Sequence, residues 1–229
     1  MPPPSVLATA LLVARKDLLI EFRTRSAFLA AVVFALVAVV IFRFSSDPTA
    51  VSPLDLAPGV LWTIFVFSGI LGLHRSFGVE QADRAVDALL AAPVPREAVF
   101  LGKLLANFAF VAAVQLVAIP AVALFYDLPV GGGILAGIFL VAALAAVGLV
   151  AVGTLFSAMT VNTRLAELLL PMLALPFFVP VVTPAALATA RLLAGRPLAE
   201  VAGMLKLLGS FDLVFLVACT LAFPYTLED

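Results

Sequence analysis

Side chains able to perform chemistry are few in this chain of 229 residues. It contains one histidine and one cysteine, so it holds neither a multi-histidine metal site nor a disulfide framework of its own. The motifs G-x-x-x-x-G-K-[ST], G-x-S-x-G and H-E-x-x-H do not occur, which argues against a P-loop nucleotide site and the usual hydrolase and zinc-protease centres. We therefore predict that the chain is not an enzyme and carries neither a cofactor nor a metal.

Three polar side chains in apolar surroundings are candidates for another role. His74 stands beside a basic residue at the end of an apolar run, where it could ligate a haem iron, although an interface position is the commoner use. Asn107 and Gln115 lie within another apolar run. They could line a substrate path, but hydrogen bonding between helices is the more frequent role of such residues.

The amino-acid composition indicates what class of protein carries these polar residues. Hydrophobic residues make up 64% of the chain and charged residues only 12%, against roughly 45–50% and 25% in soluble domains. The 13 basic and 14 acidic residues give a net charge of −1, so there is no general attraction for nucleic acid. We predict an all-α integral membrane protein embedded in a lipid bilayer.

Runs without charge mark where the chain crosses the membrane, because a span needs about 20 apolar residues. We predict a single transmembrane domain over residues 1–229 with six helices. Their approximate limits are residues 25–42, 58–73, 104–125, 134–157, 168–183 and 207–225.

The distribution of basic residues predicts the orientation. Nine lie on the side that holds the N-terminus, namely Arg15, Lys16, Arg23, Arg25, Arg75, Arg84, Arg96, Lys103 and Arg164. The other four lie opposite, namely Arg43, Arg191, Arg196 and Lys206. We therefore expect both termini in the cytoplasm.

Two further helical elements are predicted outside the spans. Apolar residues recur at helical spacing between residues 6 and 25, which indicates an amphipathic helix along the cytoplasmic interface or, alternatively, an extension of the first span. On the outer side, residues 185–194 and 198–208 are separated by Gly195, Arg196 and Pro197. Since neither stretch is long enough to cross, we predict a short extracytoplasmic helical hairpin.

The cytoplasmic segment of residues 77–103 is longer than a simple connection requires. It combines an acidic helix that has an apolar side with two prolines that end it and a basic restart. Such a surface indicates docking to another protein; the alternative is a helix that rests on lipid headgroups.

The fifth predicted span is rich in proline. Pro171, Pro176 and Pro180 each remove an internal hydrogen bond, and Pro184 follows one turn later. A kinked or interrupted helix of this kind often lines a substrate path or gate, but it also serves simply to bend a helix around its neighbours.

The cytoplasmic pattern resembles that of type-2 ABC-transporter permeases. It consists of the acidic helix followed by Leu89-Leu90-x-x-Pro93-x-Pro95 and Gly102-Lys103. The windows Ala-Pro-Gly-x-x-Trp ending at Trp62, Asn162-x-Arg164 and the proline run of residues 170–180 are similar to those of the cytochrome c maturation permease B family, also called haem exporter protein B.

The resemblance implies a bacterial inner-membrane permease in which the cytoplasmic segment docks onto a separate ATPase that consumes ATP. The residues matching this coupling helix are Glu80, Asp83, Asp87, Leu89, Leu90, Pro93, Pro95, Arg96 and Lys103. The resemblance further implies a homodimer, a haem-handling membrane subunit and a periplasmic haem chaperone as partners, with haem as cargo or as the load of the released chaperone.

Three other functions stay open at this point. The chain could be a type-2 permease for a different cargo, such as a lipid-linked glycan or a drug. It could instead be a passive scaffold of an assembly complex. A membrane-bound enzyme would require turnover by the purified chain without a partner.

Overall fold

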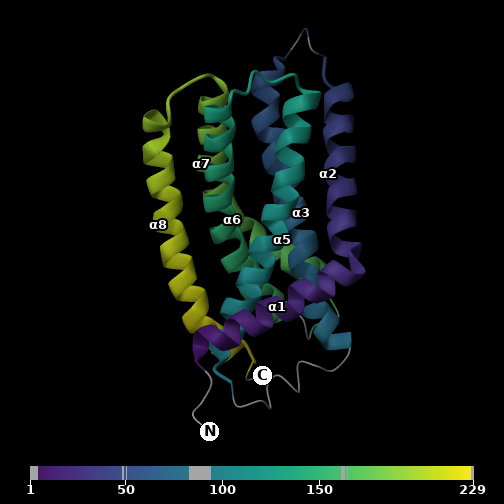
Figure 1. Cartoon of the computed structure of the whole chain (residues 1–229), viewed down its shortest axis with the longest axis vertical. Coiled ribbons are helices and arrows are strands. Elements are labelled where there is room, and N and C mark those ends of the chain that lie inside the picture. Colours follow the sequence, from purple (N-terminus) through teal and green to yellow (C-terminus); the bar gives the residue numbers. More distant parts are fainter. Residues whose placement is uncertain are drawn as a thin grey trace.

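The chain folds into a bundle of long helices that stand side by side (Figure 1). The computed structural model describes residues 5–47, 49, 51–82, 94–160, 163 and 165–227. Six of the helices in this part of the chain are long and apolar enough to cross a membrane. The predicted all-α architecture with six transmembrane helices is thereby confirmed.

The spans run alternately up and down through the bundle. They are α2 (Ser26–Ser45), α3 (Pro53–Ala82), α5 (Arg96–Phe125), α6 (Gly132–Thr160), α7 (Ala166–Leu193) and α8 (Leu198–Ala222), and a short 3-10 helix, η1 (Phe223–Leu227), follows. An even number of crossings returns the chain to its starting side, so the first helix and η1 lie at one end of the bundle (Figure 1). We call this the terminal end and the opposite one the far end.

The first helix, α1 (Val6–Thr24), crosses beneath the terminal end instead of running along the bundle (Figure 1). One side packs against α5 so closely that a Cβ on Gly102 would lie 2.6 Å from the carbonyl oxygen of Ala10. The other side exposes Leu7, Leu12 and Phe22. Because a transverse helix with an exposed apolar side suits the membrane interface, α1 matches the predicted interfacial helix.

A sharp corner joins α1 to α2. Arg25 adopts the left-handed conformation, with φ 53°, which is uncommon for a residue other than glycine. Glu21 Oε1 accepts a hydrogen bond of 2.9 Å from the backbone N–H of Phe28 in the first turn of α2. This carboxylate therefore caps α2 and lies near the positive end of its helix dipole.

The helices that flank the predicted docking segment extend beyond their predicted spans. α3 and α5 each contain 30 residues, which corresponds to about 45 Å of helix, whereas the hydrocarbon core is about 30 Å thick. The predicted spans end at residue 73 and begin at residue 104 because charged residues bound the apolar runs there, and the membrane-spanning part of α3 does end at His74. The structure shows that those charges lie on extensions of the same helices.

The predicted extracytoplasmic hairpin is wrong. α7 continues to Leu193 and α8 begins at Leu198, so the two stretches are the ends of long spans joined by a tight turn. Gly195 has φ +74°, its N–H donates to Leu192 O, and the N–H of Arg196 donates to Arg191 O. This is a Schellman ending, which requires glycine in the left-handed position. The error arose because residues 185–194 and 198–208 were judged by themselves and found too short to cross, whereas each is one end of a long helix.

The proline-rich helix α7 is continuous in the structure, with all four prolines inside it. Pro176 and Pro180 are exposed on its outer side, whereas Pro184 is buried and Pro171 is half-buried. The interruption that the prolines suggested is therefore absent from the described part of α7, and two of the three gate candidates face away from the bundle interior.

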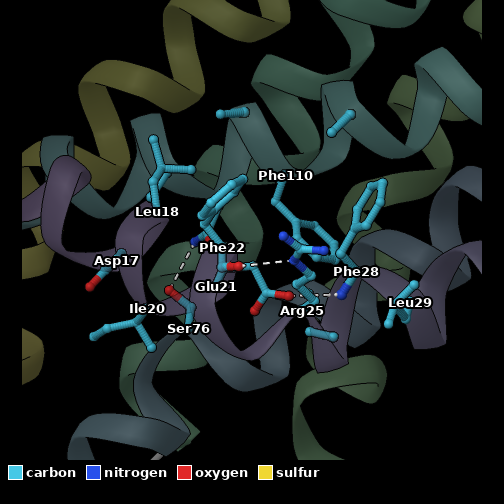
Figure 2. A pocket seen from close by; sticks show the side chains of 16 residues that line it. Asp17, Leu18, Ile20, Glu21, Phe22, Arg25, Phe28, Leu29, Ser76 and Phe110 are labelled. Carbon is cyan, nitrogen blue, oxygen red and sulfur yellow. Dashed lines mark hydrogen bonds between the residues drawn. The ribbon is translucent and has the colours of Figure 1, made fainter.

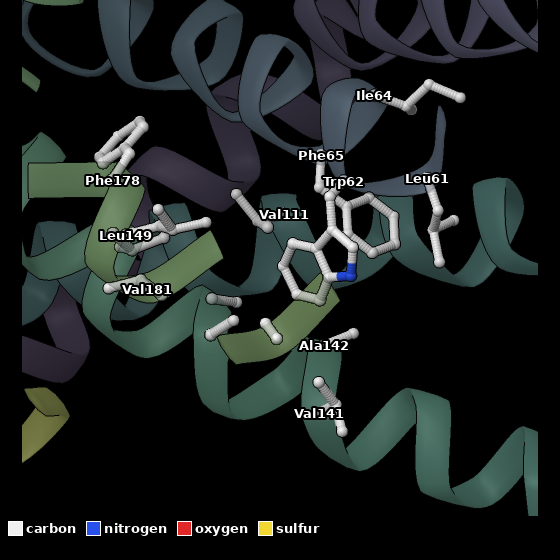
Figure 3. Packing of buried hydrophobic residues seen from close by; sticks show 14 of the residues in the cluster. Leu61, Trp62, Ile64, Phe65, Val111, Val141, Ala142, Leu149, Phe178 and Val181 are labelled. Atoms are coloured by element: carbon white, nitrogen blue, oxygen red, sulfur yellow. The ribbon is translucent and has the colours of Figure 1, made fainter. Parts of the chain in front are cut away.

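The bundle core is built around Trp62 on α3 (Figure 3). Its ring packs edge-on against Phe65 at 5.3 Å between centroids, and alanines such as Ala142 on α6 leave space for it. Its Nε1–H donates a 3.1 Å hydrogen bond to Thr189 Oγ1 on α7. A buried indole needs such a partner, so this contact fixes α3 against α7.

Candidate functional site

The two ends of the predicted docking segment meet at the terminal end of the bundle. The last turns of α3 and the first turns of α5 lie there, with α1 crossing next to them (Figure 1). Charged and polar side chains in these turns connect four helices inside an otherwise apolar bundle. We call this cluster the terminal junction and define it by Asp17, Ser76, Lys103, Asn107 and Thr154.

Lys103 is the centre of the junction. Its side chain is completely buried. The ammonium group donates to Ser76 O on α3 at 2.7 Å and pairs with Asp17 Oδ2 on α1 at 3.2 Å. A buried charge is tolerated only when it is paired and hydrogen-bonded. The structure therefore moves Lys103 from the predicted docking surface to the interior, where it joins three helices.

Asn107 extends the junction one turn further along α5. Its Nδ2 donates to Ser76 Oγ on α3 and to Thr154 Oγ1 on α6, both at 3.0 Å. One turn away on α6, Ser157 Oγ donates to Leu73 O on α3 at 2.8 Å. Asn107 thus makes interhelical hydrogen bonds, the commoner of its two predicted roles.

The start of α5 is also attached to the C-terminal turn. Pro95 precedes the first helical residue, and Arg96 Nη1 donates a 2.9 Å hydrogen bond to Pro224 O in η1. The rings of Phe100 and Phe223 lie 5.2 Å apart and are both buried. Arg96 therefore has a structural contact in addition to its predicted place in the docking segment.

A cavity of about 580 Å³ lies beside the junction, at the corner between α1 and α2 (Figure 2). We call it the corner cavity; its walls come from α1, α2, α3 and α5. Phe22, Phe28 and Phe110 line it, and Asn107 reaches it from the junction. In Figure 2 the side chains of Arg25, Glu21 and Phe110 point toward this space. The lining is mainly apolar.

The remaining sequence candidates lie apart from one another. Gln115 donates to Ala142 O on α6 at 3.1 Å, another interhelical bond. His74 is half-buried next to Leu73 on α3 and does not line the corner cavity. Its Nε2 is buried without a hydrogen-bond partner among the described residues. The proline candidates on α7 join neither the junction nor the cavity.

Most of the predicted coupling helix lies outside the part of the chain that the structure describes. Glu80 lies near the end of α3. Asp83, Asp87, Leu89, Leu90 and Pro93 fall outside the described residues. The junction nevertheless fixes where the two ends of this segment leave the bundle.

Asp212 on α8 is a buried ionisable residue that sequence reasoning did not select. It is 6% exposed, and neither carboxyl oxygen has a hydrogen-bond partner in the described part of the chain. A Cβ on Gly148 of α6 would lie 2.8 Å from Oδ1, so the carboxyl rests against that backbone. The available signal was an acidic residue within an apolar helical pattern, since such residues are rare and often functional.

Arg43, Tyr126 and Asp47 are ionisable residues at the far end of the bundle. Arg43 Nε donates to Phe125 O at 3.0 Å and its guanidinium lies 6.0 Å from the ring centroid of Tyr126. Burial raises the pKa of the Tyr126 hydroxyl, and the positive charge of Arg43 partly opposes this shift. In the exposed loop after α2, hydrogen bonds from Thr49 lower the pKa of Asp47.

Comparisons with known proteins cover almost the whole chain. The family model described as CcmB protein matches residues 8–229. Heme exporter protein B of Rhodobacter capsulatus is 32% identical over 165 residues, which is 72% of this chain and 75% of that protein. Its namesake in Paracoccus denitrificans is 31% identical over 208 residues, covering 90% and 89%. The one in Pseudomonas aeruginosa is 27% identical over 178 residues, covering 75% and 76%.

Proposed function

Since the chain belongs to the CcmB protein family, we propose that it is the membrane permease subunit of a haem-export system for c-type cytochrome biogenesis. The observation that carries the proposal is the family match over residues 8–229, together with relatives named Heme exporter protein B that align with up to 90% of the chain. The six spans supply the membrane domain that such a role needs.

The proposal includes a separate ATPase subunit as the source of energy. This is supported by the sequence, which lacks a P-loop, and by the predicted docking segment between α3 and α5. We place the terminal end in the cytoplasm and the chain in the bacterial inner membrane. The excess of basic residues on that side favours this orientation.

The terminal junction would transmit force from the ATPase. A push on the docking segment moves the end of α3 and the start of α5, which are tied together by Lys103 and Ser76. From there Asn107 connects to α6 through Thr154. On the side of α6 that meets α7, the rings of Phe156 and Phe177 lie 5.2 Å apart. Movement would thus reach the proline-rich helix α7 through packed side chains and not through an outer hairpin.

The wider assembly also belongs to the proposal. Six spans are half of the usual membrane unit of such transporters, which supports a homodimer. The exposed prolines of α7 could then contribute to a path or gate only on the outer surface of this chain. We include as partners a membrane haem-handling subunit and a periplasmic haem chaperone, and haem would be either conducted or released on the loaded chaperone.

The test uses the complete complex in a strain that lacks the native subunit. Replacing Asp83 and Asp87 together with asparagine should reduce ATPase recovered by affinity purification at least several-fold, and haem-stained c-type cytochromes should fall in parallel. Arg96 is a poorer choice, since its loss would also loosen the contact with Pro224. The matched control is Asp47→Asn in the exposed far-end loop.

Two results would contradict the proposal. Full recovery of the ATPase with the double variant would remove the docking assignment. Normal cytochrome maturation in cells whose ATPase cannot hydrolyse ATP would reduce the chain to a passive scaffold.

A further inference from the structure

We propose that the corner cavity binds one phospholipid of the adjacent leaflet, with an acyl chain inside it and the phosphate on Arg25. The cavity has a volume of about 580 Å³, within the roughly 300–1,000 Å³ of typical ligand sites. It lies between an interfacial helix and three transmembrane helices, so lipid is the molecule available at its opening.

The walls of the cavity suit an acyl chain. Phe28 and Phe110 form an edge-to-face pair with 6.5 Å between ring centroids. Next to them, Gly72 admits the Phe110 ring, because a Cβ there would lie within 2.3–2.6 Å of two ring carbons. Ala109 and Ala113, one helical turn apart on α5, leave the space that larger side chains would fill. The shape therefore depends on small residues that face aromatic rings.

The polar groups at the opening select the head of the ligand. Arg25 is exposed, its Nε donates to Phe22 O at 3.2 Å, and its guanidinium lies 5.2 Å from the Phe22 ring centroid. No hydrogen bond from its two terminal nitrogens is found among the described residues. A guanidinium held in this way binds phosphate through two parallel hydrogen bonds.

Two carboxylates at the cavity narrow the choice further. Asp17 pairs with Lys16 and Lys103, and Glu21 caps the start of α2. The charge of Asp17 is neutralised by its two lysines, so the negative charge that bears on the ligand is that of Glu21. Glu21 lies beside Arg25 (Figure 2), and this pair of opposite charges suits a phospholipid head that carries a phosphate and an ammonium group better than an amphiphile that carries only carboxylates, such as haem.

The experiment measures lipid retained by the purified full-length chain after extensive washing in detergent, using native mass spectrometry. Wild-type protein should retain one phospholipid per chain. Ala113→Trp, which fills the cavity, should abolish retention, whereas Leu116→Trp, on the exposed side of the same helix, should not. Arg25→Gln should weaken binding of added phosphatidylethanolamine roughly tenfold, the loss of one charge-assisted contact. The matched control Arg15→Gln, exposed on α1 outside the cavity, should leave binding unchanged.

A second measurement covers the case in which Ala113→Trp does not fold. Wild-type protein is reconstituted with a phospholipid that carries a photoreactive group at the end of one acyl chain, and the cross-linked peptide should contain residues 106–113 of α5. Cross-links spread evenly over the exposed side of α2 and α5 would overturn the proposal. It would equally fail if Ala113→Trp and wild type retained the same lipid, or if haem was retained in place of lipid. Because no ATPase is present, these outcomes are independent of the docking proposal.

Discussion

Two buried ionisable residues, Lys103 on α5 and Asp212 on α8, show how differently one bundle treats charge. Lys103 is completely enclosed and has partners on α1 and α3. Asp212 is almost as deeply buried, but neither carboxyl oxygen has a hydrogen-bond partner among the described residues. The first connects helices at the cytoplasmic end of our proposed permease, whereas the second makes no hydrogen bond to another helix in the part of the chain that the structure describes.

The different surroundings of Lys103 and Asp212 predict different contributions of the terminal junction and the α6–α8 contact to stability. A charge removed from water is held in place by its partners, so the terminal junction is a rigid connection between helices. An unpartnered carboxyl in the membrane lowers stability and is retained where another state or a partner makes use of it. We therefore expect substitution of Asp212 at the α6–α8 contact to raise stability, whereas substitution of Lys103 lowers it.

The largest expected effect comes from breaking the satisfied pair. Lys103→Met removes the buried partner of Asp17, which is half-buried and keeps its contact with Lys16. The free energy of unfolding in mixed micelles should therefore fall by about 3 kcal/mol, the lower end of the loss for a broken buried pair. The double variant with Asp17→Leu should recover part of that loss, since both charges are then absent. Equal losses in the single and double variants would show that packing, and not the charge pair, determines the stability of the junction.

The unsatisfied carboxyl should respond in the opposite direction. Asp212→Leu has similar volume and removes two oxygens that have no hydrogen-bond partner among the residues described, so the free energy of unfolding in the same assay should rise by about 1 to 3 kcal/mol. Asp212→Asn keeps polar atoms at the site and should change stability little. Destabilisation by leucine would mean that the carboxyl has a partner in the folded chain, while greater stability with loss of cytochrome maturation would assign it a functional role.

Neutral hydrogen bonds between helices should affect the free energy of unfolding less than the charged groups of Lys103 and Asp212 do. Asn107→Ala removes two such bonds and should lower the free energy of unfolding by about 0.6 to 1.7 kcal/mol, which is between the average and the largest value for one interhelical bond in a membrane. Gln115→Ala removes one and should lie at the lower end of that range. If Asn107→Ala lowered the free energy of unfolding as much as Lys103→Met, the stability of the terminal junction would depend on the amide of Asn107 as much as on the charge of Lys103.

The smallest effect on stability is expected at Asp47. This carboxylate is exposed and accepts hydrogen bonds, whereas the Asp212 carboxyl is buried and has no donor among the described residues. Hydrogen bonds from Thr49 lower the pKa of Asp47 in the folded loop. Its contribution is therefore complete above the unfolded pKa of roughly 4 and is lost as the pH falls through the folded value. The protection factor of the Thr49 amide, whose N–H donates to Asp47, should fall only in strongly acidic solution, and Thr49→Ala should move that fall to a higher pH.

Prediction from the sequence succeeded where the bilayer itself imposes the rule. The low charge and the long apolar runs predicted six helices, because in hydrocarbon a spanning segment must satisfy its own backbone. The same reasoning failed at the α7–α8 connection, where the stretches on either side of the break were judged too short to cross. Gly195 and Pro197 were correctly identified as a break, but the sequence did not show that long helices lie on both sides of it.

The candidate site was predictable only in part. Asn107 and Gln115 stood out as polar residues in apolar runs, and their use in hydrogen bonds between helices follows from that setting. Lys103 was assigned to a docking surface because Gly102-Lys103 ends the cytoplasmic segment that resembles the docking segment of type-2 permeases. Its burial depends on α1, which crosses over it at Gly102 and could not be placed from helical periodicity alone.

The sequence by itself therefore determined the class of the protein, the number of crossings and the family, because composition and local pattern are properties of the chain. Tertiary structure alone decided which side chains meet. It placed Lys103 with Asp17 and Ser76, left Asp212 against Gly148, and opened the corner cavity between α1 and three spans. The physical reason is that periodicity defines the faces of a helix, whereas only packing determines which face meets which neighbour.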